Sequence, residues 1–460
     1  MLIQFSMENF GPFADRATLN MAPIRSYKEN PQSLLESGLK GVPHVLPSVL
    51  VYGPNASGKS TLVKAAGFMK EEVRKSFQRV RGDEIPVNPF LLATPEQFSA
   101  PCGMEMIFIA QDGIRYQYGF SVNATRVLRE WLYAWPISQA RTVFMRTWNE
   151  LTKKYDYSPK IFGENILGFR KHWLEDVLEN RLFLSVAAHK GGSESDDVSD
   201  VFPEEKSVNT RTNLKFIFDW FHLRLFPMFS LKSIPLKFST KMIDDSEGKK
   251  YLLDWLKQGD LVWDDLVVES KIISFDKPLP IPAATEVTVG HMAGTSDGKG
   301  LNLQKVGFLA KRVQDETVIP FPSNLVSDGT RTWLTLGGAI QKILANGEII
   351  FADEIEANLH HHLVRHLWSL FNDPATNPNK AQLVATTHNV GLLADPNLLR
   401  RDQVWLIDKN RKMASELFPL SDYSPRKGEY LLKPYLQGRF GGIPRLSRNV
   451  FPYAQGSDKT

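Results

Sequence analysis

Cysteine and long apolar runs are nearly missing from this chain of 460 residues. Cys102 is the single cysteine, so the chain cannot form an internal disulfide, and a reducing compartment is expected. No run of about 18 apolar residues occurs, which argues against a membrane-spanning helix. The first residues also lack the basic start and apolar stretch of a signal peptide. These absences predict a cytoplasmic protein without a membrane partner.

Strong charge imbalance and repeats are also missing. The formal net charge of +4 is small for this length, so it neither indicates nor excludes nucleic acid as a partner. No heptad pattern persists, which argues against a long coiled coil. Hydrophobic residues at 42% and charged residues at 23% are typical of globular proteins. The length predicts two domains, or one domain with a large insertion.

The strongest motif is a glycine-rich loop between an apolar strand (49–52) and a helix. From Gly53 to Ser60 the spacing matches the phosphate-binding loop G-x-x-x-x-G-K-[ST]. Glycine can adopt backbone angles that turn successive N–H groups toward phosphate oxygens. Lys59 is expected to reach the β- and γ-phosphates of ATP, and the Ser60 hydroxyl to bind Mg²⁺. The expected ATP-binding residues are Gly53, Pro54, Asn55, Ala56, Ser57, Gly58, Lys59, Ser60 and Thr61.

A second apolar strand, 348–352, ends in adjacent carboxylates, as a Walker B strand does. Asp353 is expected to hold Mg²⁺, and Glu354 to polarise the attacking water as a catalytic residue. The alternative is a helix start with two acidic residues. The phosphate-binding loop elsewhere in the chain favours the first interpretation.

A third apolar strand, 381–386, ends in Thr387 and His388. A lone histidine after a strand is more often structural. Ligands, however, bind at the carboxyl ends of parallel strands, and this is the third strand end that carries polar groups. We therefore expect His388 to be a catalytic residue near the γ-phosphate.

A fourth polar segment, Ser-Asp-Gly-Thr, opens a helix predicted over 333–344. Its serine, glycine and backbone N–H groups at the start of a helix form a second anion cradle. Lys59 already covers the phosphates of the chain's own nucleotide, so one subunit hardly needs both cradles. We therefore expect Ser327, Asp328 and Gly329 to contact ATP bound to a second subunit.

The rest of the chain gives weaker signals. Hairpins are predicted at 2–7 with 17–21 and at 104–110 with 114–120, a strand at 126–135, helices at 61–79, 160–188, 213–226 and 249–257, and loops at 22–46, 189–197 and 285–300. His360, His361, His362 and His366 form a histidine cluster that could suggest zinc. A solvated helix start is the alternative, because no cysteine or carboxylate cage accompanies the cluster.

Taken together, the motifs resemble the heads of ABC-type ATPases, in particular the AAA-15/AAA-21 and overcoming-lysogenization-defect-like bacterial ATPases. Further matching segments are 8–10, 89–92, 354–360 and 439–444. The resemblance implies an α/β fold, an ABC-ATPase-like P-loop head with a mixed sheet flanked by helices. It implies three parts: residues 1–135 with the P-loop and a β-subdomain, an inserted helical/β region at 136–320, and residues 321–460 with the signature helix, Walker B strand, histidine switch and basic tail.

The same resemblance implies an ATPase that forms a homodimer around ATP, or a higher oligomer. It further implies a sensor or scaffold subunit of an antiphage defence complex, such as a PARIS-type system. Such a subunit controls a separate effector, a TOPRIM-like nuclease or toxin, and answers a phage-encoded trigger; contact with nucleic acid stays open. The sequence departs from the family pattern at the Q-loop, whose glutamine has no clear counterpart; Gln97 is the nearest candidate.

Two other ATPase classes compete with this interpretation. An SMC/Rad50-like DNA-repair ATPase needs a long antiparallel coiled coil between the Walker motifs, and no sustained heptads lie there. A transporter subunit is disfavoured by the unusual signature and the inserted middle region.

Overall fold

The computed structural model describes residues 1–92, 100–160, 162–191, 212–228, 234, 236–274, 284–287, 290–294, 300–311, 317–321 and 326–444. Gln97, the Q-loop candidate, and most of the predicted loop at 189–197 lie outside these residues. Within the described residues, no helix combines the length and apolar character that crossing a membrane requires.

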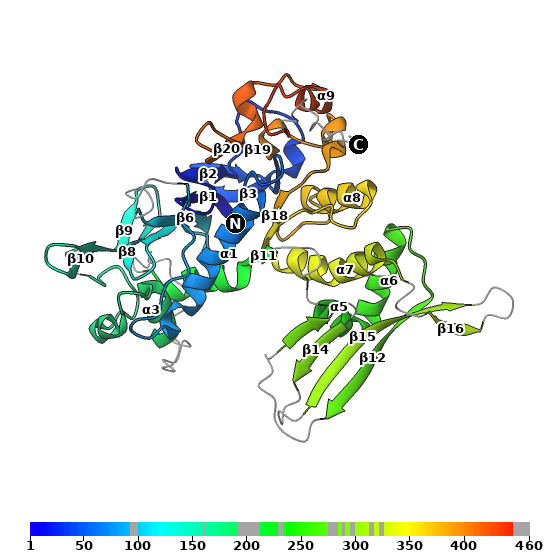
Figure 1. Cartoon of the computed structure of the whole chain (residues 1–460), viewed down its shortest axis with the longest axis horizontal. Helices are drawn as coiled ribbons and strands as arrows, with labels where there is room; N and C mark the ends of the chain where they lie inside the picture. Colours follow the sequence, from blue (N-terminus) through cyan, green and yellow to red (C-terminus); the bar gives the residue numbers. More distant parts are fainter. Residues whose placement is uncertain are drawn as a thin grey trace, which may run out of the picture.

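A six-stranded sheet forms the centre of the molecule (Figure 1). Its order is β11-β17-β18-β5-β19-β20, and all neighbours are parallel except the antiparallel pair β19 and β20. The strands are β11 (Leu225–Met228), β17 (Ile349–Ala352), β18 (Gln382–Thr386), β5 (Ser48–Tyr52), β19 (Val404–Lys409) and β20 (Ser415–Pro419). Every residue of β5, β17 and β18 is buried, as expected for parallel strands covered on both faces.

The two faces of this sheet belong to different hydrophobic cores. Side chains alternate along β5, so Val49 and Val51 face the core that contains α1 (Lys59–Lys75). Leu50 and Tyr52 face the core that contains α7 (Asp328–Asn346) and α8 (His361–Asn372). This layering confirms the predicted α/β fold with a mixed sheet flanked by helices.

An antiparallel seven-stranded sheet packs over α1, in the order β10-β9-β8-β7-β6-β1-β2. Its strands are β1 (Leu2–Glu8), β2 (Ala17–Asn20), β6 (Cys102–Ile109), β7 (Arg115–Val122), β8 (Val127–Trp135), β9 (Arg141–Asn149) and β10 (Lys154–Ser158). Both predicted hairpins and the predicted strand at 126–135 are confirmed. The expected boundary between 135 and 136 falls between β8 and β9, which pair within this sheet.

The buried Gln382 side chain joins the antiparallel sheet to the central one. Its amide oxygen accepts a hydrogen bond from the Leu2 N–H at 2.6 Å. Its amide nitrogen donates to the carbonyls of Leu2 and Leu46 at 3.0 and 3.1 Å. The oxygen and the nitrogen of this amide thus both help to fix the first strand of the chain against β18.

A third sheet, β12-β15-β14-β13 with β16 paired to β15, lies beside α5, α6 and α7 at the lower right of Figure 1. The elements are β12 (Asp265–Ser274), β13 (Ala284–Val287), β14 (Gly290–Gly294), β15 (Gly300–Lys311), β16 (Val318–Phe321), α5 (Lys237–Ile243) and α6 (Ser246–Gln258). The prediction of a loop over 285–300 is wrong at β13 and β14, which are paired strands. Strand pairing outweighs the glycines there, and the Thr and Val residues of β13 favour strands.

Three further sequence predictions need correction. The single helix predicted over 160–188 is replaced by η3 (Lys171–Asp176) and α3 (Phe183–Gly191). Gly163 and Gly168 adopt positive φ angles, which keeps the residues around them out of a helix. The helix predicted over 213–226 stops early, and Leu225 enters the central sheet. The loop predicted at 22–46 contains a β-hairpin. These two segments comprise α4 (Leu214–Asp219), the π-helical turn η5 (Trp220–Arg224), η1 (Pro31–Ser33), β3 (Leu35–Leu39) and β4 (Val42–Val45).

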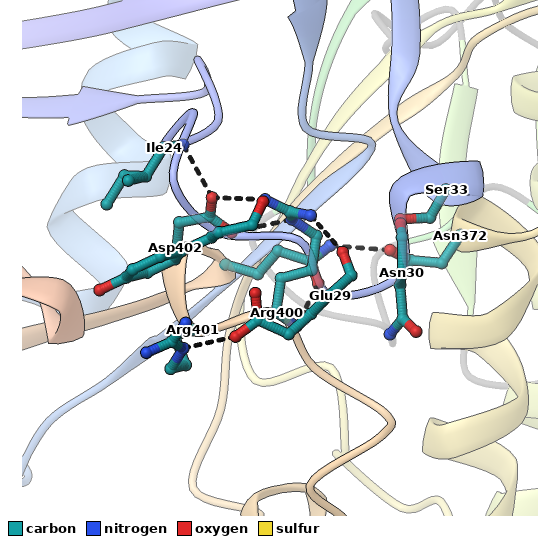
Figure 2. A network of polar contacts seen from close by, with 10 residues as sticks. Ile24, Glu29, Asn30, Ser33, Asn372, Arg400, Arg401 and Asp402 are labelled. Carbon is teal, nitrogen blue, oxygen red and sulfur yellow. Dashed lines mark hydrogen bonds and ion pairs between the residues drawn. The ribbon is translucent and has the colours of Figure 1, made fainter. Parts of the chain in front are cut away.

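A buried polar network ties the segment before β5 to the segment before β19 (Figure 2). Asp402, 4% exposed, accepts hydrogen bonds from the Ile24 N–H at 2.8 Å and from the fully buried Arg400 guanidinium at 2.8 and 3.0 Å. Arg400 also donates to the Glu29 carbonyl. Arg401 pairs with the Glu29 carboxylate at 2.5 Å. The network therefore anchors the long connection at 22–34 on the amino-end edge of the central sheet.

Replacing Asp402 by alanine should lower the stability of the chain, because it leaves the buried Arg400 charge without a carboxylate. Loss of one partner of a buried pair costs about 3–5 kcal/mol. Thermal unfolding followed by circular dichroism measures the effect. Arg365→Ala is the matched control: it removes a partly exposed pair with Asp395, and such pairs contribute about 0–1 kcal/mol. Equal melting temperatures for the two variants would contradict the anchoring role of Asp402.

Candidate functional site

Three parallel strands end together at one edge of the central sheet. In the register of the sheet Ala352 lies beside Ala385, and Thr386 lies beside Val51. Each strand is followed directly by polar residues, which are the glycine-rich loop after β5, the carboxylates after β17 and Thr387 with His388 after β18. Residues far apart in the sequence thus form one candidate nucleotide site.

The glycine-rich loop is closely packed, and its two glycines fit where larger residues would not. A Cβ on Gly53 would lie 2.6 Å from the Ile407 carbonyl oxygen. Gly58 has a φ of +108°, and a Cβ there would lie 2.9 Å from both Pro12 and Phe13. Gly58 precedes α1 without a side-chain cap, so the first N–H groups of the helix are open to an anion. This cradle suits a phosphate group.

The remaining loop residues divide into exposed and buried ones. Asn55 and Ala56 are exposed, and Ala56 has a positive φ of 58°. Ser57 is buried, and its hydroxyl has no hydrogen-bond partner among the described residues. Pro54, Ser60 and Thr61 are partly exposed, with Ser60 and Thr61 in the first turn of α1.

Lys59 reaches back over the loop. Its ammonium group donates to the carbonyls of Gly53 at 2.9 Å and Pro54 at 3.0 Å. Burial lowers the pKa of Lys59 from its usual value, whereas the nearby Asp353 and Glu354 carboxylates act in the opposite direction. The structure therefore brings the predicted phosphate-binding lysine and the predicted acid pair into one electrostatic environment.

The Thr386 hydroxyl orders the acid pair. It donates to Asp353 Oδ1 at 2.6 Å and accepts from the Glu354 N–H at 2.9 Å. Asp353 is 8% exposed, whereas the Glu354 side chain is exposed on a left-handed backbone with φ of 48°. This backbone conformation is uncommon for glutamate and often occurs at functional sites. It turns two adjacent carboxylates to different positions, one inward and one toward solvent.

Glu356 is a site residue that the sequence did not single out. It accepts hydrogen bonds from the Thr387 hydroxyl at 2.7 Å and from the His388 N–H at 2.5 Å. The loop after β17 thereby holds the loop after β18, and the His388 side chain is left exposed. In the sequence, only its short distance from Glu354 marks Glu356 as a candidate site residue. Its contacts with Thr387 and His388 depend on the pairing of β17 with β18.

The Ser-Asp-Gly-Thr segment lies at the start of α7. The Ser327 hydroxyl accepts from the Thr330 N–H at 3.2 Å, which caps the helix, and Asp328 pairs with Arg331 at 3.1 Å. A Cβ on Gly329 would lie 2.9 Å from the Asn358 carbonyl oxygen, so this turn packs on the loop after β17. Ser327 and Asp328 are exposed. Within the described residues, no hydrogen bond joins this turn to the glycine-rich loop.

The Ser60 hydroxyl and the Asp353 carboxylate at this edge provide oxygen ligands of the kind that a magnesium ion prefers. The histidines near α8 have other contacts. His361 Nδ1 lies 3.1 Å from Asn389 Oδ1, and His366 Nε2 lies 2.8 Å from Gln258 Oε1. No group of three metal-ligating side chains is found in the described parts of the chain.

Comparison with known proteins gives a family and a set of structural likenesses. The family described as "AAA domain, putative AbiEii toxin, Type IV TA system" matches residues 48–155 and 225–394, together more than half of the chain. The comparison with curated proteins finds no match.

Solved structures with a likeness include two SMC heads and a recombination mediator protein. One is the SMC head domain from Thermotoga maritima, at 8% identity and a TM-score of 0.36, covering 91% of this chain and 98% of that one. A second is an SmcHead bound to the C-winged helix domain of ScpA, at 10% identity and a TM-score of 0.35, covering 91% and 96%. A third is the recombination mediator protein RecF, at 11% identity and a TM-score of 0.32, covering 91% and 98%.

Replacing Thr386 by valine should weaken magnesium-dependent ATP binding, because the methyl group can neither hold Asp353 nor accept from the Glu354 N–H. A hydrogen bond to a charged group contributes about 1.5–3 kcal/mol, so the Mg²⁺ concentration for half-maximal binding should rise about tenfold. Titration with a fluorescent ATP analogue measures it. Thr386→Ser keeps the hydroxyl and should behave like the unchanged protein. A serine variant as weak as the valine variant would show that the methyl group matters instead.

Proposed function

Because the chain belongs to the AbiEii-type AAA-domain family, we propose that it binds and hydrolyses ATP as an ABC-type ATPase that multimerises around the nucleotide. One observation carries the proposal: Lys59 and the Asp353–Glu354 pair share one edge of the parallel sheet. The phosphate cradle and the acid pair come from segments that only the fold brings together.

In the proposed reaction, residues 53–61 bind the phosphates through backbone N–H groups and the Lys59 ammonium. Ser60 and Asp353 hold Mg²⁺, which supplies positive charge beside the phosphates. A water attacks the γ-phosphorus, the bond to the leaving ADP oxygen breaks, and Glu354 accepts a proton from the water. Exposed at the end of the neighbouring strand, His388 is proposed to contact the γ-phosphate.

The signature segment is proposed to act in trans. Ser327 and Asp328 are exposed at the start of α7, while Lys59 lies over the glycine-rich loop of its own subunit. An exposed anion cradle of this kind can cap a nucleotide held by a second copy of the chain. The proposed assembly is a homodimer with two ATP molecules between the heads, or a higher oligomer built from such pairs.

The family description names a toxin and a type IV toxin–antitoxin system. This description supports a role as the sensor or scaffold subunit of an antiphage defence complex, in which assembly around ATP controls a separate nuclease or toxin effector. The competing function is DNA repair of the SMC/Rad50 kind. Between α1 and α7 the longest helix in the described residues is α6, with 13 residues, which is too short for the arm of a long coiled coil.

Replacing Glu354 by glutamine should keep ATP bound and lower the hydrolysis rate by about 100-fold or more, the usual contribution of a general base. The trapped variant should also form a larger assembly in ATP and Mg²⁺. Phosphate release and size-exclusion chromatography with light scattering measure the two effects. The matched control is Glu247→Gln, which removes an exposed carboxylate on α6. Normal hydrolysis by the Glu354 variant would exclude Glu354 as the base.

The same trapped variant tests the defence role. A native pull-down with ATP and Mg²⁺ should co-purify an effector protein, which mass spectrometry identifies. Turnover stimulated by added DNA, without a co-purified protein, would instead support the DNA-repair function.

Mixing two inactive variants tests the trans arrangement. Lys59→Ala removes the phosphate lysine of one subunit, and Ser327→Arg blocks the signature that the subunit offers to its partner. A mixed dimer contains one site with both changes and one intact site. Random mixing should therefore restore up to about a quarter of the normal turnover. If the two segments serve the same subunit's nucleotide, the mixture will stay as inactive as either variant alone.

A further inference from the structure

A second pocket lies at the opposite edge of the central sheet, where the strands begin. It has a volume of about 880 Å³, within the range of small-ligand sites. Arg224 precedes β11, Glu348 precedes β17 and Lys380 precedes β18, and all three line it. Since these strands are parallel, the pocket is separated from the candidate ATP site by the length of the sheet.

The pocket carries an excess of positive charge. Its lining includes Lys70, Arg224, Lys342 and Lys380, against the carboxylates of Asp219 and Glu348. Asp219 pairs with Lys215 at 3.1 Å outside this group, and Glu348 pairs with Lys342 at 2.6 Å. Among the described residues, no carboxylate forms an ion pair with the other three cations of the pocket. An anion that entered would therefore meet charges that are not already neutralised.

Two of these cations are held by hydrogen bonds to backbone carbonyls, and Arg224 lies close to the backbone before β17. Lys70 donates to the Leu225 carbonyl, and Lys380 donates to the Glu36 carbonyl at 3.0 Å. A Cβ on Gly347 would lie 3.5 Å from the Arg224 guanidinium. Burial lowers the pKa of Lys70 to about 8, with a smaller contribution from Arg74. A bound anion would offset this effect and favour the charged amine.

Glu348 adds a second recognition feature. It is 3% exposed, and its Oε1 accepts from Lys342 at 2.6 Å and from Asn346 at 3.0 Å. Its Oε2 is buried and has no hydrogen-bond partner among the described residues. An unpaired buried carboxylate oxygen is costly, and an N–H or O–H donor on a ligand would satisfy it. Nucleobase amines and ribose hydroxyls provide such donors.

Apolar rings complete the lining. Phe216, Trp220 and Phe226 border the pocket, and Phe216 is 37% exposed. Aromatic side chains favour flat, partly apolar ligand groups. Positive charge, an acceptor oxygen and rings together match the three parts of a nucleotide.

We propose that this pocket is a second nucleotide site, which takes a nucleotide bearing at least two phosphates. Arg224, Lys380 and Lys70 contact the phosphates, and Glu348 accepts a hydrogen bond from the nucleoside. A pocket of this volume, lined by several cations, favours a compact polyphosphate over an extended nucleic-acid backbone.

The pocket lies at the far ends of elements that serve the candidate ATP site. Lys70 belongs to α1, which begins at Lys59; Lys342 belongs to α7, which begins after Ser327. Glu348 precedes β17, which leads to Asp353. A ligand in the pocket would therefore contact the same elements that carry Lys59, Ser327 and Asp353; a link to ATP turnover rests on the proposed ATPase function.

Binding to the full chain tests the site without any need for hydrolysis. Isothermal titration with ADP, GDP and pyrophosphate uses the Lys59→Ala protein, in which the phosphate-binding loop has lost its lysine. At least one of these probes should bind saturably. Adding Arg224→Gln and Lys380→Gln should weaken its binding about tenfold or more, as expected for lost charge-assisted hydrogen bonds. Because Lys59 is already absent, failure here does not bear on the ATPase proposal.

A matched control carries Lys412→Gln and Lys433→Gln, two exposed lysines away from the pocket, in the same background. The affinity of this control for the same probe should stay within about twofold of that of the Lys59→Ala protein, since only the net charge changes. Glu348→Gln should instead tighten pyrophosphate binding, because a carboxylate that repels the anion is removed. This increase in affinity cannot result from misfolding, so it tests the site even if the double variant fails to fold. Absence of saturable binding, an equal loss in the control, or binding of a single-stranded oligonucleotide alone would overturn the proposal.

Discussion

The parallel pairing of β5, β18 and β17 is the constraint on which the candidate site depends. It places the end of the phosphate-binding strand beside the strand that leads to His388, and that strand beside the one that leads to the acid pair. A shift of one residue between β17 and β18 would move Thr386 away from Asp353 and Glu354, and a shift between β18 and β5 would move it away from the end of the phosphate-binding strand. The fully buried, β-branched and aliphatic character of these strands fixes the register.

The side chains that hold the register also hold the site. The Thr386 hydroxyl and the Glu356 carboxylate connect successive strand ends, and neither needs to touch a nucleotide to matter. Gln382 and the Arg400–Asp402 pair do the same at the opposite edge of the sheet. Buried polar groups of this kind are costly when one partner is lost, so they favour a single arrangement of the sheets.

The sequence predicted the site residues that lie within single short motifs, but not the hydrogen bonds that join one motif to another. Gly53, Lys59 and the Asp353–Glu354 pair are recognisable because a short segment contains both the strand and the functional group. Glu356 could not be assigned, because its role appears only when β17 lies beside β18. The segment near Leu225 was predicted as helix for the same reason: its partner strand lies far along the chain.

The errors in secondary structure have a similar cause. Glycine at positive φ keeps residues before η3 out of the helix predicted over 160–188, whereas strand pairing overrode the glycines near Ala284–Val287 and Gly290–Gly294. Glycine-containing segments thus form either non-helical turns or strands, depending on whether a neighbouring strand can supply backbone hydrogen bonds. The fold class was predictable because it rests on long buried strands, for which the pattern and the pairing agree.

Helix α7 runs from the signature segment at one edge of the central sheet to the second pocket at the opposite edge. Its first residues follow the exposed Ser327, and its last turn carries Lys342 and Asn346 into the pocket at the opposite edge. The two stacked tryptophans Trp255 and Trp333, 4.3 Å apart, hold α7 against α6, with each indole N–H donating to the other residue's carbonyl. This packing makes α7 one continuous element between the signature and the second pocket. A nucleotide in the proposed second site would therefore contact the same helix that presents Ser327 to a second subunit.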